Sequence, residues 1–489
     1  MNHRTSKRIE HIRQVAVYIL MACTVFVIVT FITLFMLGFR FDAGKGGLEQ
    51  YAFLQFASSP SGATVSIDGQ LVGSKTPNKS SVPPGKHVIE MWRDGYETWS
   101  KTVDVKAGTL TWLNYTLLVP KKLTVESVLN YDTVSGSLAS PNGNSILVQK
   151  KADIPTFELI NLSSDTVKSS TITIPKTVIT DFSTTGIVHS YKAEKWDSGG
   201  RYVLVKHGYG AKSEWLVMDT QNVASSKNIS KTFDVAIDSI VFSDTSGNMF
   251  YALETNDIRK LDLSAGTMSR PLISNVTSFE IYEKSRVITY VGFGASGTDQ
   301  RVVGIYREGD DGPSVIRTVS GDSSIPLNIS TTNYFNENYI AISEGKKVDV
   351  LSGSYPNTTT DNANTMKVVA SFSVQQNITK LSFSQIGEFV LAQAGPDFAS
   401  YDLEYAKLYV SSVAGSGETY NLKWLDENHL WSDRDGKLTI REFNGSEVHT
   451  INPVIIGQDS TLTNNGRYIY SINSAKTGFQ LQRVRMILP

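Results

Sequence analysis

The sequence predicts an all-β protein that begins with one membrane-spanning helix. Three observations carry this prediction. The segment from Val15 to Phe39 is apolar and contains no charged side chain. Beyond it, short runs that alternate between apolar and polar residues are separated by Asp-Gly, Pro-Gly and Asn-Gly turns. From about Thr124 to Pro489, a unit of strands and polar turns recurs at intervals of about 40–55 residues.

Residues 15–39 are long enough to cross a membrane as a helix. About 25 helical residues at about 1.5 Å each extend about 37 Å, against a hydrocarbon core of about 30 Å. Arg and Lys are more frequent before this segment than directly after it, so the positive-inside rule places residues 1–14 in the cytoplasm. The sequence therefore predicts a single-pass protein of the cell membrane, with a linker at residues 40–54 and extracytoplasmic C-terminal domains.

A cleaved signal sequence is the main alternative to this anchor. Leu20-Met21-Ala22-Cys23 is similar to a bacterial lipobox, in which the Cys is lipidated after cleavage. The residues after such a Cys are usually polar, whereas Thr24 to Leu37 is apolar. The pattern favours an anchor that is not cleaved.

Composition indicates a large globular part outside the membrane. The formal net charge is −1, which gives no electrostatic reason to expect a nucleic-acid partner. The single cysteine, Cys23, lies in the apolar segment, so the remaining chain has no cysteine from which to form a disulfide. Its stability must come from burial of its core.

Residues 55–120 have the pattern of a small antiparallel β-sandwich. Ala63 to Ile67 alternates with period 2 and is followed by Asp68-Gly69, a dipeptide that favours a tight turn. Two further strand-like runs follow, each preceded by a turn dipeptide: Lys86 to Trp92 and Tyr96 to Val105.

This segment resembles the PEGA domain family. The tetrapeptide that names the family reads Pro60-Ser61-Gly62-Ala63 here, with Ser in place of Glu. The resemblance implies a cell-envelope module that often stands beside a membrane anchor, and it implies no catalytic residue. The residues that carry it are expected to be structural: Pro60, Gly62, Ala63, Asp68, Gly69, Pro84, Gly85, Gly95, Tyr96 and Trp99.

Three aromatic residues of this segment allow two interpretations. Trp92, Tyr96 and Trp99 could form a platform on which a sugar stacks, or they could fill the core of a small domain without disulfides. The second interpretation is favoured because a domain of this size needs the large buried area that aromatic side chains supply.

The repeating unit from residue 121 to 489 has the length of one four-stranded blade of a β-propeller. The length of the segment fits seven or eight blades. Several units begin with a polar turn such as Ser140-Pro141-Asn142-Gly143, which resembles the Ser-Pro-Asp-Gly turn of TolB-like bacterial β-propellers. The resemblance concerns architecture and implies no particular activity.

In a propeller, the loops between the second and third strands of all blades emerge on one face. This loop is predicted to be long at residues 150–156, 208–212, 292–300 and 395–405. Because loops on a rigid scaffold commonly carry binding function, this face is the predicted binding face. The longest loop supplies the candidate binding residues Asp397, Phe398, Tyr401, Asp402, Glu404 and Tyr405.

Catalytic and metal-binding signatures are scarce. The seven histidines are dispersed, and no short metal-ligand pair, nucleophile elbow or Walker loop is present, so neither a metal nor a cofactor is expected. Asp433, Asp435 and Gly436 match part of a calcium loop, but Trp431 occupies its first ligand position and a tight hairpin explains them better.

The predicted function is non-covalent recognition. The protein would be a membrane-anchored scaffold of the cell envelope, without enzymatic activity, that binds an envelope protein or a cell-wall polymer through the propeller face. The alternative is an extracytoplasmic hydrolase or lyase that acts in the funnel of the propeller. Carboxylates or histidines that converge at the ends of the inner strands would favour the alternative.

Overall fold

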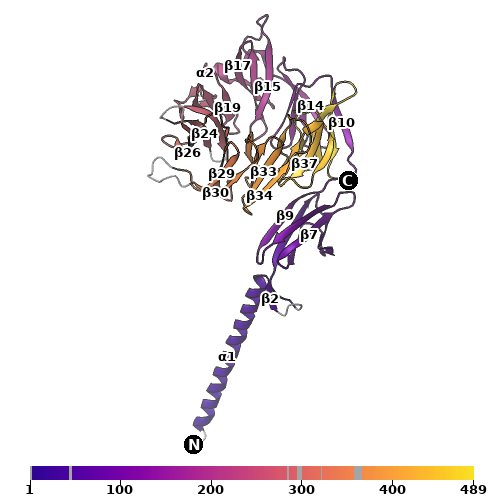
Figure 1. The fold of residues 1–489 in the computed structure, drawn as a ribbon, viewed down its shortest axis with the longest axis vertical. Helices are drawn as coiled ribbons and strands as arrows, with labels where there is room; N and C mark the ends of the chain where they lie inside the picture. The colour runs from indigo at the N-terminus through magenta and orange to yellow at the C-terminus, as the bar shows by residue number, and fades with distance from the viewer. Residues whose placement is uncertain (1–2, 43–46, 283–285, 295–299, 321, 357–365) are drawn as a thin grey trace. The chain divides into compact units, whose positions relative to one another are not determined.

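The computed structural model describes residues 3–42, 47–282, 286–294, 300–320, 322–356 and 366–489. It divides into two compact units (Figure 1). The first comprises Met1–Lys122 together with Ile487–Pro489, and the second comprises Leu123–Met486. The two units are described separately below.

Helix α1 (His3–Met36) contains all but the last three residues of the predicted apolar segment. Within the described residues it is the one helix that is long and apolar enough to cross a membrane, over Arg13–Met36, with a mean hydropathy of 2.7. Its apolar side chains are exposed, and Phe26 has 72% of its surface accessible. The hydroxyls of Thr24 and Thr33 donate hydrogen bonds to backbone carbonyls four residues earlier, so these polar groups are satisfied within the helix.

The helix ends three residues before the predicted boundary at Phe39. Gly38 adopts a φ of +85°, which terminates the helix, and Phe39 begins strand β1 (Phe39–Asp42). Strand β1 pairs with β2 (Gly47–Gln50), so a two-stranded hairpin stands where the sequence predicts only a linker. Alternation over four residues is too short to identify such a strand from sequence.

A two-layered sandwich follows the hairpin. One sheet has the order β6-β3-β9 and the other β5-β4-β7-β8. The predicted all-antiparallel arrangement is wrong at one place, because β3 and β9 pair in parallel, with Phe53 opposite Leu110. The strand bounds are β3 (Ala52–Ser59), β4 (Thr64–Ile67), β5 (Gln70–Leu71), β6 (Asn78–Val82), β7 (Gly85–Trp92), β8 (Trp99–Val105) and β9 (Leu110–Leu117).

The core of the sandwich forms from alternate residues of both sheets. Leu54, Phe56, Val65, Ile89 and Met91 are fully buried. Four of them belong to β3 and β7, whose burial alternates along the chain, as expected when one face of a sheet packs on another.

The last residues of the chain complete this core. Leu488 packs against the buried cluster of the sandwich, and its backbone N–H donates to the hydroxyl of Tyr96 at 2.7 Å. A Cβ on Gly95 would lie only 2.8 Å from a methyl group of Leu488. Residues 487–489 therefore belong to the first unit, whereas the sequence places them in the propeller.

The second unit is a β-propeller. Its described part contains eight four-stranded antiparallel sheets, arranged in a ring in Figure 1. We number these blades 1–8 from the first sheet formed by consecutive strands. The innermost strands of blades 1–8 are β11 (Gly136–Ala139), β15 (His189–Trp196), β19 (Ser239–Phe242), β23 (Val276–Tyr282), β27 (Leu327–Tyr334), β31 (Lys380–Phe383), β35 (Leu422–Trp424) and β39 (Thr461–Leu462).

The remaining strands of each blade follow its innermost strand in chain order. In blades 1–4 they are β12 (Ser145–Gln149), β13 (Thr156–Asn161), β14 (Lys168–Thr173), β16 (Tyr202–Tyr209), β17 (Lys212–Asp219), β18 (Lys227–Asn228), β20 (Met249–Glu254), β21 (Asp257–Asp262), β22 (Thr267–Met268), β24 (Val287–Phe293), β25 (Gln300–Arg307) and β26 (Ser314–Ser320). In blades 5–7 they are β28 (Glu337–Glu344), β29 (Lys347–Ser352), β30 (Lys367–Ser373), β32 (Phe389–Ala394), β33 (Asp397–Asp402), β34 (Lys407–Ser412), β36 (His429–Ser432), β37 (Lys437–Glu442) and β38 (His449–Pro453).

Blade 8 combines the two ends of the propeller segment. Strands β39, β40 (Tyr468–Ser474) and β41 (Phe479–Arg485) come from its C-terminal end, and the outermost strand, β10 (Val125–Tyr131), comes from its N-terminal end. Antiparallel pairing of β10 with β41 closes the ring. The pairing and the sheet count resolve the predicted seven or eight blades in favour of eight.

We predict that Leu488→Ala destabilises the sandwich by about 1–2 kcal/mol, because the substitution removes a partly buried side chain from a small core. Hydrogen exchange of the full-length protein should accelerate in β7 and β8, which lie in the core of the sandwich. The control is Pro489→Ala, at an exposed position. Unchanged exchange in Leu488→Ala would mean that the last residues do not contribute to the core.

Candidate functional site

A cavity of about 370 Å³ opens beside the innermost strands of blades 1 and 2. Its walls come from three parts of the propeller: the first three strands of blade 1 with the loop between its second and third strands, strand β15 of blade 2, and the segment before β39 of blade 8. All three contributions lie where innermost strands begin and second strands end. The cavity is therefore on the face that carries the loops between second and third strands, which is the face that the sequence predicts to bind.

Small residues leave this space open. Seven of the 14 lining residues are glycine, alanine or serine. The larger side chains form an apolar wall of Leu138, Leu147, Phe157 and Tyr191, all of which also pack in or against the core between blades 1 and 2. The wall is therefore held in place by the packing of two blades, which makes the cavity a preformed feature of the ring.

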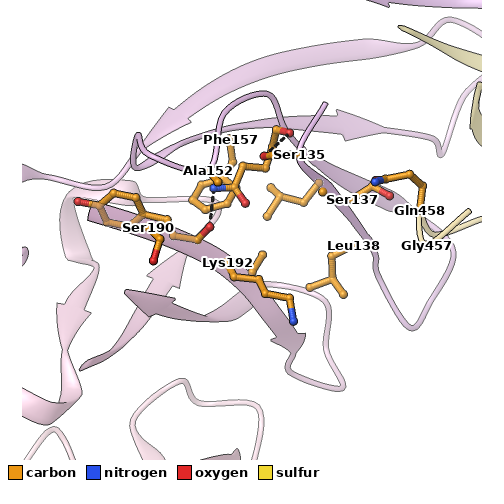
Figure 2. A pocket seen from close by; sticks show the side chains of 14 residues that line it. Ser135, Ser137, Leu138, Ala152, Phe157, Ser190, Lys192, Gly457 and Gln458 are labelled. Atoms are coloured by element: carbon orange, nitrogen blue, oxygen red, sulfur yellow. Dashed lines mark hydrogen bonds between the residues drawn. The ribbon is translucent and has the colours of Figure 1, made fainter. Parts of the chain in front are cut away.

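The polar groups of the cavity are only partly used by the protein itself. Figure 2 shows Ser190 and Gln458 on opposite sides of the cavity. The carbonyl oxygen Oε1 of Gln458 is buried and has no hydrogen-bond partner within the described residues. The hydroxyl of Ser137 accepts a hydrogen bond from the backbone N–H of Asp459, so its own hydrogen remains available.

Other polar lining groups are occupied. The side-chain amide of Gln149 donates to the backbone carbonyl of Tyr191 at 2.8 Å, and the hydroxyl of Ser135 donates to the carbonyl of Gln149 (Figure 2). Lys192 forms an exposed ion pair with Glu194, with an N–O distance of 3.0 Å. The pair leaves the cavity close to electrically neutral.

A chain of hydrogen bonds lies behind Tyr191. The ring of Tyr191 stacks on that of His207, with centroids 4.5 Å apart. Nδ1 of the fully buried His207 lies 2.7 Å from Oε1 of Glu214, and its Nε2 lies 2.9 Å from Nδ1 of His189. Thr180 and Asn228 donate to the other carboxylate oxygen, Oε2, of Glu214. We call His189, His207 and Glu214 the histidine relay.

The hydrogen bonds determine the charge and tautomers of the relay. Burial opposes ionisation of Glu214, but hydrogen bonds from His207, Thr180 and Asn228 outweigh it and hold the pKa of this carboxyl below its ordinary value. An ionised Glu214 only accepts, so His207 carries a hydrogen on Nδ1, and in neutral rings its Nε2 accepts from His189. Nε2 of the half-buried His189 then keeps a lone pair with no partner within the described residues.

The relay was not predicted, because its histidines are dispersed in the sequence. His189 and Tyr191 alternate on β15, and His207 and Tyr209 alternate on β16, where Tyr191 is the direct partner of His207. Glu214 lies opposite His207 on β17. Alternation places these side chains on one face of blade 2. The period-2 pattern of His and Tyr in two consecutive strands is the signal that could have revealed the relay.

The prediction of a long loop at residues 395–405 is wrong. Strands β32 and β33 are joined by the two-residue turn Gly395–Pro396, because Gly395 reverses the chain with a φ of +59°. Four of the six candidate residues are therefore part of strand β33, and two of these four are buried. The four are Asp397, Phe398, Tyr401 and Asp402, of which Phe398 and Asp402 are buried.

The other two candidates, Glu404 and Tyr405, lie in the turn between β33 and β34, on the opposite face of the propeller. Asp402 stabilises this turn by accepting hydrogen bonds from both backbone N–H groups. Burial raises the pKa of Asp402 to about 6, and the hydroxyl of Tyr334 donates to Glu404. The six residues thus do not form one site.

The other loop predictions have mixed outcomes. The long loop of blade 1 is present between β12 and β13 and contributes Ala152 to the cavity. The loop of blade 2 is only the two residues between Tyr209 and Lys212. The loop predicted at residues 292–300 lies largely outside the described residues.

In the sandwich, the core interpretation of the aromatic residues is confirmed for Tyr96 and Trp99, which are 1% and 2% exposed. Trp92 is half-buried. Asp68 and Gly69 form the predicted turn with positive φ, and Asp68 accepts hydrogen bonds from His87 and from the N–H of Val88. The hydrogen bond from His87 and that from Val88 lower the pKa of Asp68.

The structure also shows the predicted hairpin at the partial calcium motif. Asp433 to Gly436 form a turn between β36 and β37, and the carboxylate of Asp433 accepts hydrogen bonds from Asn421 and Gly457. Across the described residues, no group of three or more His, Cys, Asp and Glu side chains is arranged to hold a metal ion.

The fold defines the class of protein. Along the chain, a long apolar helix is followed by a small β-sandwich and then by an eight-bladed β-propeller that contains the cavity. Residues 53–119 match the family model of the PEGA domain. No curated protein matches the chain by sequence.

The solved structures to which the chain is similar include the following three, and the first of them is a β-propeller domain. Their identities are low and their TM-scores are below 0.5, so the assignment of the propeller rests on the strand pairing. The Cps50 (Swd1) β-propeller domain of Myceliophteria thermophila is 14% identical with a TM-score of 0.38, and the match covers 68% of this chain and 99% of that chain. Hsv2 of Kluyveromyces lactis is 10% identical with a TM-score of 0.39, and the match covers 73% of this chain and 99% of that chain. A chain of the yeast Nup82-Nup159-Nup116 nucleoporin complex is 10% identical with a TM-score of 0.42, and the match covers 65% of this chain and 97% of that chain.

We predict that Glu214→Gln lowers the free energy of unfolding by about 1–3 kcal/mol at neutral pH, because it removes a buried charge that accepts several hydrogen bonds. A lowered folded pKa stabilises the protein above the ordinary carboxyl pKa of 4.5, and this contribution is lost as the pH falls through the folded value. The difference between wild type and variant should therefore shrink below about pH 4.5.

Chemical denaturation at several values between about pH 3 and pH 7 measures this difference in the free energy of unfolding. Glu418→Gln, at an exposed position, serves as the matched control and should show no such dependence. A difference that is independent of pH would show that ionised Glu214 is not the stabilising species.

Proposed function

We propose that this protein is a membrane-anchored, extracytoplasmic scaffold of the cell envelope. Its propeller would bind an envelope protein or a cell-wall polymer without catalysing a reaction. The observation that carries this proposal is the cavity on the loop-bearing face of a closed ring, with a buried acceptor that no described residue satisfies. Preformed cavities with a few unused polar groups are the usual form of a binding site.

The anchor of the proposed scaffold is helix α1. The apolar side chains of α1 are exposed along its length, which would be costly in water and is expected for a helix surrounded by lipid. Arg4, Lys7, Arg8 and Arg13 precede the apolar segment and favour a cytoplasmic N-terminus. The PEGA domain at residues 53–119 would then act as a spacer or as a contact with the wall.

This orientation predicts that protease added to intact cells with a permeable outer layer digests both the sandwich and the propeller. A tag placed before His3 should remain protected, because it would be cytoplasmic. Protease that digests the tag while the propeller stays protected would contradict the proposed topology. Detergent lysis serves as the control, since both parts must then become accessible.

Binding is tested by a pull-down from native envelope fractions, with the tagged full-length protein in a mild detergent as bait and with proteins and wall polymer scored separately. The scaffold is supported if the wild type retains a single protein or a polymer, and if replacement of Ser190 by a bulky residue abolishes this retention. No difference between wild type and the variant would contradict binding through this face.

One observation favours a second candidate function, an extracytoplasmic hydrolase. The histidine relay ends at His189, at the start of an inner strand, and the buried carboxylate of Glu214 lies behind the two imidazoles. A carboxylate in this position orients the ring of a catalytic histidine. His189 would act as a general base toward water.

If the protein is a hydrolase, the full-length protein cleaves a chromogenic ester, peptide or glycoside, and His189→Gln lowers the rate about 100-fold or more without lowering the melting temperature. Steady-state rates on the three substrate types measure this effect. Rates equal to those of a boiled sample on all three would contradict the hydrolase.

A further inference from the structure

We propose that the cavity between blades 1 and 2 receives one apolar side chain of an extended peptide, together with the peptide unit that precedes it. This inference rests on the proposed scaffold function and names the chemistry that its partner presents. Three properties of the cavity support it: its unused hydrogen-bonding groups, its apolar wall and its charge.

The unused groups match a peptide unit. Oε1 of Gln458 is a buried acceptor that lacks a donor among the described residues, and a backbone N–H would supply one. The hydroxyl of Ser137 has a free hydrogen because its oxygen accepts from Asp459, and Ser190 makes no side-chain hydrogen bond within the described part of the chain. A backbone carbonyl accepts from such hydroxyls. One donor and one acceptor in close succession are what every peptide unit presents.

The apolar wall matches an aliphatic side chain. Leu138, Leu147 and Phe157 line the cavity together with the small residues Ala152 and Ala193. Leu138 is the most exposed of the three larger side chains, because Leu147 and Phe157 are each only 1% exposed and the ring of Phe157 offers no flat platform for stacking. A sugar ring recognised by an aromatic residue usually stacks on an exposed face, whereas an aliphatic side chain fits a recess.

The charge of the cavity favours a neutral ligand. Lys192 is the charged residue of the lining and is already paired with Glu194. The other polar lining groups are the hydroxyls of serine and tyrosine and the amides of glutamine, which are neutral. A neutral peptide segment therefore fits better than a phosphate or a carboxylate, which would have to compete with Glu194.

The size of the cavity limits the ligand. About 370 Å³ lies near the lower end of the range for small-molecule sites, about 300–1,000 Å³. It accommodates one residue and part of its neighbour. The rest of the partner would contact the surrounding loops, as is common when a single buried anchor contributes most of the affinity of an interface.

The experiment uses the full-length protein in lipid nanodiscs and three small probes. The first probe, N-acetyl-leucine N-methylamide, carries one aliphatic side chain between two peptide units. N-acetylglycine N-methylamide lacks the side chain, and N-acetylglucosamine represents the carbohydrate class. Saturation-transfer NMR identifies which probe hydrogens contact the protein, and a titration gives the dissociation constant.

The leucine probe should bind, with its methyl groups receiving the strongest saturation. The glycine probe should bind about tenfold more weakly or worse, because it buries no side chain. Gln458→Leu should weaken binding of the leucine probe about fivefold by removing the acceptor. Ser190→Leu should weaken it at least as much by filling the cavity. Gln221→Leu is the matched control, since Gln221 is exposed and outside the cavity, and it should change nothing.

The melting temperature of the Gln458→Leu variant tests the proposal independently of probe binding. Gln458→Leu removes a buried acceptor without a partner, so the melting temperature should stay the same or rise. A lower melting temperature with unchanged probe binding would make Gln458 a structural residue and overturn the proposal. Binding of the leucine probe that neither cavity variant weakens would do the same.

Two outcomes separate this inference from the scaffold function. Binding of N-acetylglucosamine, sensitive to Ser190→Leu, in place of the leucine probe would assign the cavity to a carbohydrate. If no probe binds while the full-length protein still retains an envelope component, the scaffold function stands and the peptide inference fails.

Discussion

Antiparallel pairing between β10 and β41 is the interaction on which the propeller depends. It joins Val125 to Val484 and Tyr131 to Phe479, residues that are separated by almost the whole length of the propeller segment. Without β10, blade 8 would have three strands and the ring would have two free ends. The closure is reinforced by a buried cluster that contains Tyr131, Tyr468 and Leu481 together with apolar residues of blade 1. Forming such a contact costs loop-closure entropy, which the apolar burial offsets.

The cavity lies beside this closure. Asp459 of blade 8 donates its backbone N–H to Ser137, and its carboxylate accepts from the N–H of Ala139, both in β11. These hydrogen bonds place Gln458 next to the start of blade 1. Blade 2 contributes Tyr191, which the stacked His207 holds from behind. The cavity is therefore lined by segments from both ends of the ring, and its geometry depends on the same pairing that closes the fold.

Local features of the sequence predicted the elements well. The uncharged run from Val15 to Phe39 predicted helix α1 to within three residues at its end, and alternation before Asp68-Gly69 predicted strand β4 and the turn after it, but not the short strand β5. Aromatic residues of a small domain were expected in its core, where Tyr96 and Trp99 lie. The candidate site was not predictable in the same way. Asp397 to Tyr405 looks like a polar loop, yet a single reversal at Gly395 turns most of it into a strand. His189, His207 and Glu214 are ordinary strand residues until pairing places them side by side.

The sequence by itself determined the all-β class, the apolar helix, the small sandwich and the repeat of blades. These properties depend on periodicity and composition, which are local and can be read along the chain. Only the tertiary structure decided that there are eight blades, that β10 closes the ring, that Leu488 completes the sandwich, and that a cavity opens between blades 1 and 2. Each of these depends on contacts between residues far apart in sequence, whose partners are selected by the packing of the whole ring rather than by any local pattern.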